Sequence, residues 1–255
     1  MKRPIVIANW KMNKTVAQAT DYARCLKELL SVVSGVEIIL AVPFTTLHAL
    51  AEVIQGSRIN LAAQNIHWED HGPYTGEISA LQVRDAGGHY TLVGHSERRQ
   101  YFGEGYDQVN QKIHAASRHQ LCPVMCVGET QAEREAKRTL DVIEEQMSKG
   151  LVGIRPDPFE HLLIAYEPVW AIGTGKTVTP QEASEVHRHI RRTMNDLWGS
   201  SAGTKVRVLY GGSVTAQNAS FFLNEPEVDG LLVGGASLDF KEFSEIVKCA
   251  NRRSL

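Results

Sequence analysis

The stretch HLLIAYEPVWAIGTGKTVTPQEASEVHRHIRRTMNDLW, residues 161–198, holds one complete strand, loop and helix. Its first six residues are a short, mostly apolar run, which predicts a buried strand that ends before Glu167. A helix should begin after Thr179, because Pro180 suits the first helical position and Glu182 completes a capping box. The apolar residues that follow fall on one helical face, at Val186, Ile190, Met194 and Leu197.

Apolar runs of the same kind recur along the whole chain. They lie at residues 5–9, 37–42, 60–64, 90–94, 122–127, 161–166, 205–210 and 230–234. Several are continuously apolar, which is typical of parallel strands covered by helices. The spacing averages about 32 residues, enough for one strand, one crossover helix and two loops. Eight such units favour a closed α/β barrel, and an open doubly wound sheet is the alternative.

Other helix signals agree with this organisation. Thr130 and Glu133 repeat the capping-box spacing after the fifth strand. One face of the first predicted helix collects Tyr22, Leu26, Leu29 and Val33. No linker rich in Pro, Gly or Ser divides the chain, so we expect residues 1–255 to form one domain.

Composition excludes several classes of protein. The 255 residues are 43% hydrophobic and 22% charged, with a net charge of −2, so we expect a globular protein that binds neither nucleic acid nor membranes. Four scattered cysteines are too few for a disulfide framework. The apolar run near Met1 is too short for a signal peptide, and these features favour a cytoplasmic protein.

Polar residues follow most of the predicted strands. In a closed barrel the carboxyl ends of the strands meet at one end, where the active site lies. The residues found there are Asn9, Lys11, Gln64, Asn65, His95, Ser96, Glu97, Glu129 and Glu167. A solvated loop residue explains any one of them, but a coincidence at so many strand ends is much less plausible.

Glycine pairs follow the last two strands, at residues 211–212 and 234–235. A backbone without Cβ atoms can approach a ligand and turn its N–H groups inward, which suits a phosphate, although tight turns also need glycine. A nucleotide P-loop and a dinucleotide fingerprint are excluded, because Trp170 and Val178 stand where glycines are required. The spacing of histidines and cysteines does not favour a metal site.

Seven segments together resemble the triosephosphate isomerase family, in family order and over nearly the whole chain. They are NWKMN (9–13), AQN (63–65), GHSERR (94–99), CVGE (126–129), YEPVWAIGTGKT (166–177), YGGSV (210–214) and LVGGASL (232–238). The resemblance implies a (β/α)8 TIM barrel with a closed eight-stranded parallel sheet. It also implies interconversion of dihydroxyacetone phosphate and glyceraldehyde 3-phosphate, with no cofactor and no metal.

The resemblance assigns the proton chemistry to two side chains. Glu167 would be the base that removes a proton from the carbon beside the substrate carbonyl. His95 would stabilise the resulting enediolate as a neutral hydrogen-bond donor. Ser96 would support it, since it begins a short helical pattern whose N-terminal dipole disfavours a positive imidazole.

Substrate binding is implied at further positions. Lys11 would bring positive charge to the oxyanion and the phosphate, Asn9 would donate a hydrogen bond, and Glu97 would hold Lys11 in place. The backbone N–H groups implied for the phosphate are those of Gly173, Ser213, Gly234 and Gly235.

The resemblance also implies a homodimer and a lid. Residues 66–79 form a long loop, and its tip near Thr75 would insert beside the catalytic residues of a second copy. A mobile surface loop is the alternative. Residues 168–178 have the composition of a lid between stiff ends, with Ile172 covering the site.

Three departures from the family pattern bear on the structure. Lys14 follows NWKMN where glycine is usual, and Val178 replaces the common alanine at the second hinge of the lid. Gln120 occupies a helix end where glycine is expected, and it would cost up to about 1 kcal/mol if that position is left-handed.

Two other classes of protein are possible on the same fold, a different barrel enzyme and a non-catalytic scaffold. A Schiff-base aldolase would need a lysine after the sixth strand, and a two-carboxylate glycosidase would need a carboxylate after the seventh. The chain has Glu167 and Ser213 at these places. A non-catalytic scaffold is disfavoured because Glu167 and His95 are both present.

Overall fold

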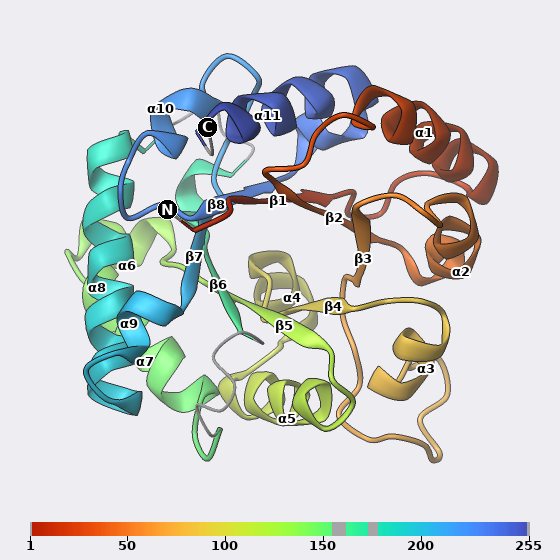
Figure 1. Cartoon of the computed structure of the whole chain (residues 1–255). Coiled ribbons are helices and arrows are strands. Elements are labelled where there is room, and N and C mark those ends of the chain that lie inside the picture. Colours follow the sequence, from red (N-terminus) through yellow and green to blue (C-terminus); the bar gives the residue numbers. More distant parts are fainter. Residues whose placement is uncertain (1, 155–161, 173–177, 254–255) are drawn as a thin grey trace.

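The computed structural model describes residues 2–154, 162–172 and 178–253. Eight parallel strands pair in sequence order, and the first closes on the last (Figure 1). They are β1 (Ile5–Asn9), β2 (Glu37–Val42), β3 (Ile59–Ala63), β4 (Tyr90–Val93), β5 (Cys122–Val127), β6 (Leu163–Tyr166), β7 (Arg207–Tyr210) and β8 (Gly230–Val233). The predicted closed barrel is confirmed, and the open sheet is excluded.

Helices surround the barrel (Figure 1). They are α1 (Val16–Leu29), α2 (Phe44–Val53), α3 (Ala80–Asp85), α4 (Ser96–Phe102), α5 (Tyr106–Arg118), α6 (Gln131–Glu135), α7 (Thr139–Gly150), α8 (Pro180–Trp198), α9 (Ala202–Lys205), α10 (Ala219–Leu223) and α11 (Phe240–Arg252), with short 3-10 helices η2 (Val169–Ala171) and η3 (Gly235–Leu238). Both predicted capping boxes are confirmed, at the starts of α6 and α8. Each box satisfies backbone N–H groups that the first helical turn leaves free.

Closure of the barrel depends on a close backbone approach between β1 and β8. Ile5 pairs with Gly230, and a Cβ atom at residue 230 would lie 2.0 Å from the Ile5 carbonyl oxygen. Only glycine fits this seam. Alternate strand residues then fill the interior, a group that includes Ile7, Ile39, Ala62, Leu92, Val124, Ala165, Leu209 and Leu232.

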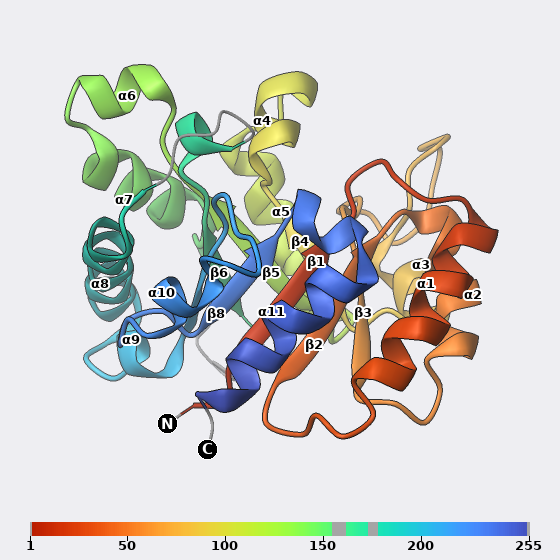
Figure 2. The ribbon, with the colours of Figure 1, turned by 90° about the horizontal axis from the view of Figure 1, so that it is seen from above.

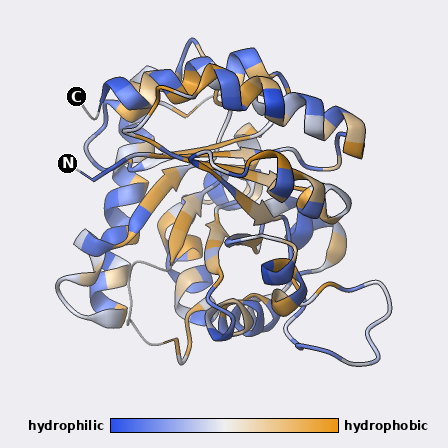
Figure 3. Cartoon of the chain, turned by 45° about the vertical axis from the view of Figure 1, so that its right-hand side comes forward, coloured by the Kyte–Doolittle hydropathy of each residue, from blue (hydrophilic) through white to orange (hydrophobic). Residues whose placement is uncertain are grey.

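The second, larger core lies between the strands and the helices. Figure 3 shows the strands mostly hydrophobic and the helices with mixed surfaces. The predicted helical faces are buried except at two positions: Leu29 and Leu197 are each 37% exposed. Both stand in the last turn of their helices, where the side chain no longer faces the sheet.

The two ends of the barrel differ. Figure 2 shows both chain termini at one end, and α4 and α6 at the other. Helix α4 follows β4 after two residues, so this second end is where the strands' carboxyl ends and the predicted site residues lie. In the described ranges, no helix is both long and apolar enough to cross a membrane.

Three residues discussed in the sequence analysis, two lysines and a glutamine, adopt left-handed backbone conformations. The φ angles are +52° at Lys11, +73° at Lys14 and +55° at Gln120. The left-handed conformation expected at Gln120 is therefore confirmed, and the predicted cost relative to glycine is up to about 1 kcal/mol. The same strain at Lys11 and Lys14 falls beside the site, where it must be held by surrounding contacts.

Candidate active site

A hollow of about 500 Å³ opens at the carboxyl ends of the strands. Its lining comes from the loops after β1, β4, β6, β7 and β8, and includes seven of the predicted site residues: Asn9, Lys11, His95, Glu167, Ser213, Gly234 and Gly235. Ile172 also lines it. Gly173 and the rest of residues 173–177 lie outside the described residues, so the predicted lid is described only at its two ends.

Glu167 is fixed at the end of β6 by both its backbone and its carboxylate. Its N–H donates to the Val127 carbonyl at 2.7 Å. One carboxylate oxygen, Oε1, lies 3.0 Å from His95 Nε2, and Oε2 accepts the Ser96 backbone N–H at 3.0 Å. Burial raises the pKa of Glu167, but the contacts with His95 and Ser96 outweigh it and leave the pKa below its usual value.

His95 caps the start of α4. Its Nδ1 accepts the Glu97 backbone N–H at 3.3 Å, so the ring proton of the neutral form lies on Nε2 and points at Glu167. Burial lowers the pKa of His95, while the adjacent Glu167 carboxylate raises it, and the net shift is upward. The two groups are therefore coupled, each favouring the charged form of the other.

Lys11 is held in its strained conformation by three contacts. Its backbone N–H donates to Asn9 Oδ1 at 3.0 Å, and its Nζ lies 2.6 Å from Glu97 Oε1. Gln64 donates to the Lys11 carbonyl at 2.9 Å and reaches the Asn9 Oδ1 at 3.4 Å. The sequence analysis gave Gln64 no role in supporting Lys11. Its position directly after a strand was the only sequence signal that it belongs to the site.

The glycines after β7 and β8 form the other wall of the hollow. A Cβ atom at Gly211 would lie 3.1 Å from the Cγ atom of Glu167, and one at Gly234 would lie 3.6 Å from the Cε atom of Lys11. The Ser213 hydroxyl donates to the Ala171 carbonyl at 3.0 Å and so joins the loop after β7 to η2. Small residues here let the backbone come close to the side chains of Glu167 and Lys11.

Two other strand-end residues lie outside the hollow. Glu129 is fully buried and accepts hydrogen bonds from Trp170 Nε1 at 2.8 Å and from the Tyr166 hydroxyl at 3.2 Å. Burial raises the pKa of Glu129. Asn65 accepts a hydrogen bond from Lys112 at 2.8 Å. We assign both to support of the barrel end, because neither lines the hollow.

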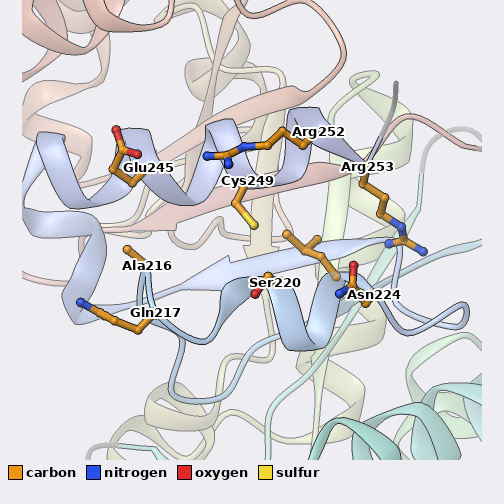
Figure 4. Close-up of a pocket in the computed structure, with 9 residues that line it drawn as sticks. Ala216, Gln217, Ser220, Asn224, Glu245, Cys249, Arg252 and Arg253 are labelled. Carbon is orange, nitrogen blue, oxygen red and sulfur yellow. The ribbon is translucent and has the colours of Figure 1, made fainter.

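A second hollow, of about 550 Å³, lies between α10 and α11 (Figure 4). Cys249 faces it, and burial raises the pKa of this thiol, which keeps it protonated and weakly nucleophilic. Across the described parts of the chain, no three His, Cys, Asp or Glu side chains gather as a metal-ligand set. The first hollow is the candidate active site, because it contains the contacting pair Glu167 and His95 together with the Lys11 ammonium.

Comparisons with known proteins agree with this assignment. The sequence model of the triosephosphate isomerase family matches residues 4–250. Triosephosphate isomerases from Endomicrobium trichonymphae and Moorella thermoacetica are 49% and 47% identical to the chain, over 97% of it and over 99% and 98% of their own lengths. The crystal structure of triosephosphate isomerase from Bartonella henselae has a TM-score of 0.87 at 38% identity, covering 97% of this chain and 98% of that one. The chain belongs to the triosephosphate isomerase family.

Proposed function

We propose that Glu167, His95 and Lys11 carry out the reaction of this isomerase. The enzyme interconverts dihydroxyacetone phosphate and D-glyceraldehyde 3-phosphate, a step of glycolysis. The observation that supports the residue assignment most directly is the contact of the Glu167 carboxylate with His95 Nε2 at 3.0 Å, inside a hollow that also holds Lys11. A base, a neutral donor and a cation then surround one ligand.

The proton moves in two steps. The Glu167 carboxylate takes a proton from the carbon beside the carbonyl of dihydroxyacetone phosphate, and the electron pair of the broken C–H bond forms an enediolate. His95 Nε2–H and the Lys11 ammonium stabilise the oxyanion, with Asn9 as a further donor. Within the enediolate, the hydroxyl proton must also pass to the other oxygen. His95 carries this transfer, because its Nε2–H gives a proton to one oxygen and the ring nitrogen then takes the hydroxyl proton of the other. The protonated Glu167 then returns its proton to the neighbouring carbon, which gives glyceraldehyde 3-phosphate.

Substrate entry changes the balance of charge in the hollow. In the free enzyme the attraction between Glu167 and His95 raises the pKa of the histidine and lowers that of the carboxyl. A substrate between them weakens this attraction and leaves burial as the larger effect. Burial lowers the pKa of His95 and raises that of Glu167, so the complex has a neutral imidazole and a stronger base.

The phosphate is bound at the glycine-rich wall. Backbone N–H groups of Ser213, Gly234 and Gly235 would bind its oxygens, with Lys11 providing charge nearby. Gly173 is proposed as a fourth N–H donor from the sequence alone. Glu97 and Ser96 act as supporting residues, since they hold Lys11 and Glu167 respectively.

Isomerisation in heavy water tests the proton-transfer mechanism. Because the carboxyl proton of Glu167 exchanges with solvent in the intermediate, the product should contain deuterium at the carbon that receives the proton. Mass spectrometry of the product at low conversion measures this, with unreacted substrate in heavy water as the control. A product free of deuterium would contradict exchange of the transferred proton with solvent in the intermediate.

We further infer a homodimer. A third hollow, of about 240 Å³, lies beside Lys11 and His95 and is rimmed by exposed apolar side chains, Met12 at 96% and Phe102 at 69% exposure. Figure 1 shows the orange loop between β3 and α3 extending beyond the barrel. Contacts within the loop hold its two ends together. The His67 ring stacks on Trp68, and the His67 backbone N–H donates to the Ile78 carbonyl at 2.8 Å. A braced loop and a hollow with exposed apolar side chains at its rim support mutual insertion.

Light scattering of the active enzyme at micromolar concentration should give twice the chain mass of 28.2 kDa. Thr75→Arg places a charge at the exposed loop tip and should yield monomers with reduced activity, since the catalytic residues lose their support. Val32→Arg, at a position 87% exposed, is the matched control and should stay dimeric. A fully active monomer would contradict the dimer.

We also propose a cytoplasmic location, which the state of the cysteines supports. All four cysteines are free, two of them buried in β5, which suits a reducing compartment.

A further inference from the structure

Lys14 makes contacts that a glycine at this position could not make. Its Nζ donates to the Leu238 carbonyl at 2.8 Å, across 224 residues of sequence. The same ammonium lies 4.5 Å from the centre of the Tyr22 ring and 5.4 Å from that of Trp10. Burial lowers the pKa of Lys14, and the nearby Asp239 carboxylate opposes this shift. These contacts offset the cost of its left-handed backbone.

The carbonyl that Lys14 binds belongs to η3, the segment directly after β8. Tyr22 binds the same segment, because its hydroxyl donates to the Ser237 carbonyl at 2.7 Å. Two side chains, one from the loop before α1 and one from the middle of that helix, therefore satisfy successive carbonyls at the C-terminal end of η3. A four-residue 3-10 helix leaves these carbonyls without partners of its own.

The other end of η3 lies in the active-site hollow. Gly234 and Gly235 line this hollow, and Gly234 approaches the Lys11 side chain. The Ser237 N–H and hydroxyl both reach the Gly234 carbonyl, at 2.8 Å and 2.7 Å. The short segment η3 therefore connects the Leu238 carbonyl, which Lys14 binds, with the proposed phosphate donors at Gly234 and Gly235.

We propose that Lys14 is a positioning residue for phosphate binding. It holds η3 so that the N–H groups of Gly234 and Gly235 face the phosphate, while Lys14 itself does not line the hollow. This inference rests on the proposed phosphate site. It predicts that Lys14 matters for the phosphate end of the substrate and not for proton transfer at the carbon end.

Lys14→Met tests the proposal, because methionine keeps the apolar stem and the same backbone strain but removes the ammonium. The inhibition constant of inorganic phosphate should rise about five- to tenfold, and kcat/KM for glyceraldehyde 3-phosphate should fall by a similar factor. The kcat/KM for glyceraldehyde, which has no phosphate, should stay unchanged. Lys14→Arg keeps the donor and the charge and should restore most of the phosphate affinity.

Two further variants keep the result interpretable. Lys27→Met removes a lysine of α1 that also binds carbonyls, those of Val53 and Gln55, away from the hollow, and should leave phosphate inhibition unchanged. Tyr22→Phe removes the second donor to η3 and should weaken phosphate inhibition in the same direction as Lys14→Met.

Three outcomes would overturn the inference. Equal phosphate inhibition of wild type and Lys14→Met would refute the role of Lys14 and leave the proposed phosphate site standing. An equal loss of activity toward glyceraldehyde would show general damage to the site. An absence of phosphate inhibition in the wild type would refute the proposed phosphate site itself, and the inference with it.

Discussion

Glu167→Gln should lower kcat at least about 10²-fold, because the amide keeps the size of the side chain but cannot accept the substrate proton. The amide can still accept the Ser96 N–H, so the side chain should keep its place. Inhibition by inorganic phosphate should change little, since the proposed phosphate donors lie on the glycine-rich wall. Steady-state kinetics in both directions, with phosphate inhibition as the internal control, measures the effect.

The outcome separates two explanations of the site. A general base is lost completely when its carboxylate is replaced, whereas a residue that only shapes the hollow would affect KM and phosphate inhibition as well. Near-normal turnover of a folded Glu167→Gln enzyme would show that Glu167 is not the general base.

Gly128→Ala should displace Glu167 through its backbone. A Cβ atom at residue 128 would lie 1.7 Å from the Glu167 carbonyl oxygen and 2.6 Å from its carbonyl carbon. Both atoms belong to the backbone, so β5 and β6 must move apart at the residue that holds the carboxylate. We expect kcat to fall about 10²-fold from misplacement of Glu167 and the free energy of unfolding to fall by about 1–3 kcal/mol.

Gly105→Ala is the matched control for this variant. Nothing lies within 4 Å of a Cβ atom at Gly105, which caps the start of α5 at the surface. It should cost up to about 1 kcal/mol of stability, as a weaker helix cap, and leave kcat unchanged. Chemical unfolding and steady-state kinetics of both variants provide the comparison. Equal effects at the two positions would show that the contact with Glu167 is not the cause.

Local sequence patterns predicted the repeated strand and helix units and most residues of the candidate site. Each strand was visible as a short apolar run, and the capping boxes at Thr130 and Thr179 marked helix starts, because these signals depend only on neighbours in the chain. Polar residues after the strands indicated the hollow, since all parallel strands present their carboxyl ends at the same side of a sheet. The resemblance to a family then supplied the roles.

The tertiary structure alone decided how those units meet. Hydrophobic periodicity does not distinguish an open sheet from a barrel, because closure depends on pairing between Ile5 and Gly230, at opposite ends of the chain. The contact of His95 with Glu167, the support of Lys11 by Gln64 and the bond from Lys14 to Leu238 likewise join residues that the sequence separates by 72, 53 and 224 positions. Such contacts follow from strand register and side-chain packing, which local patterns leave open.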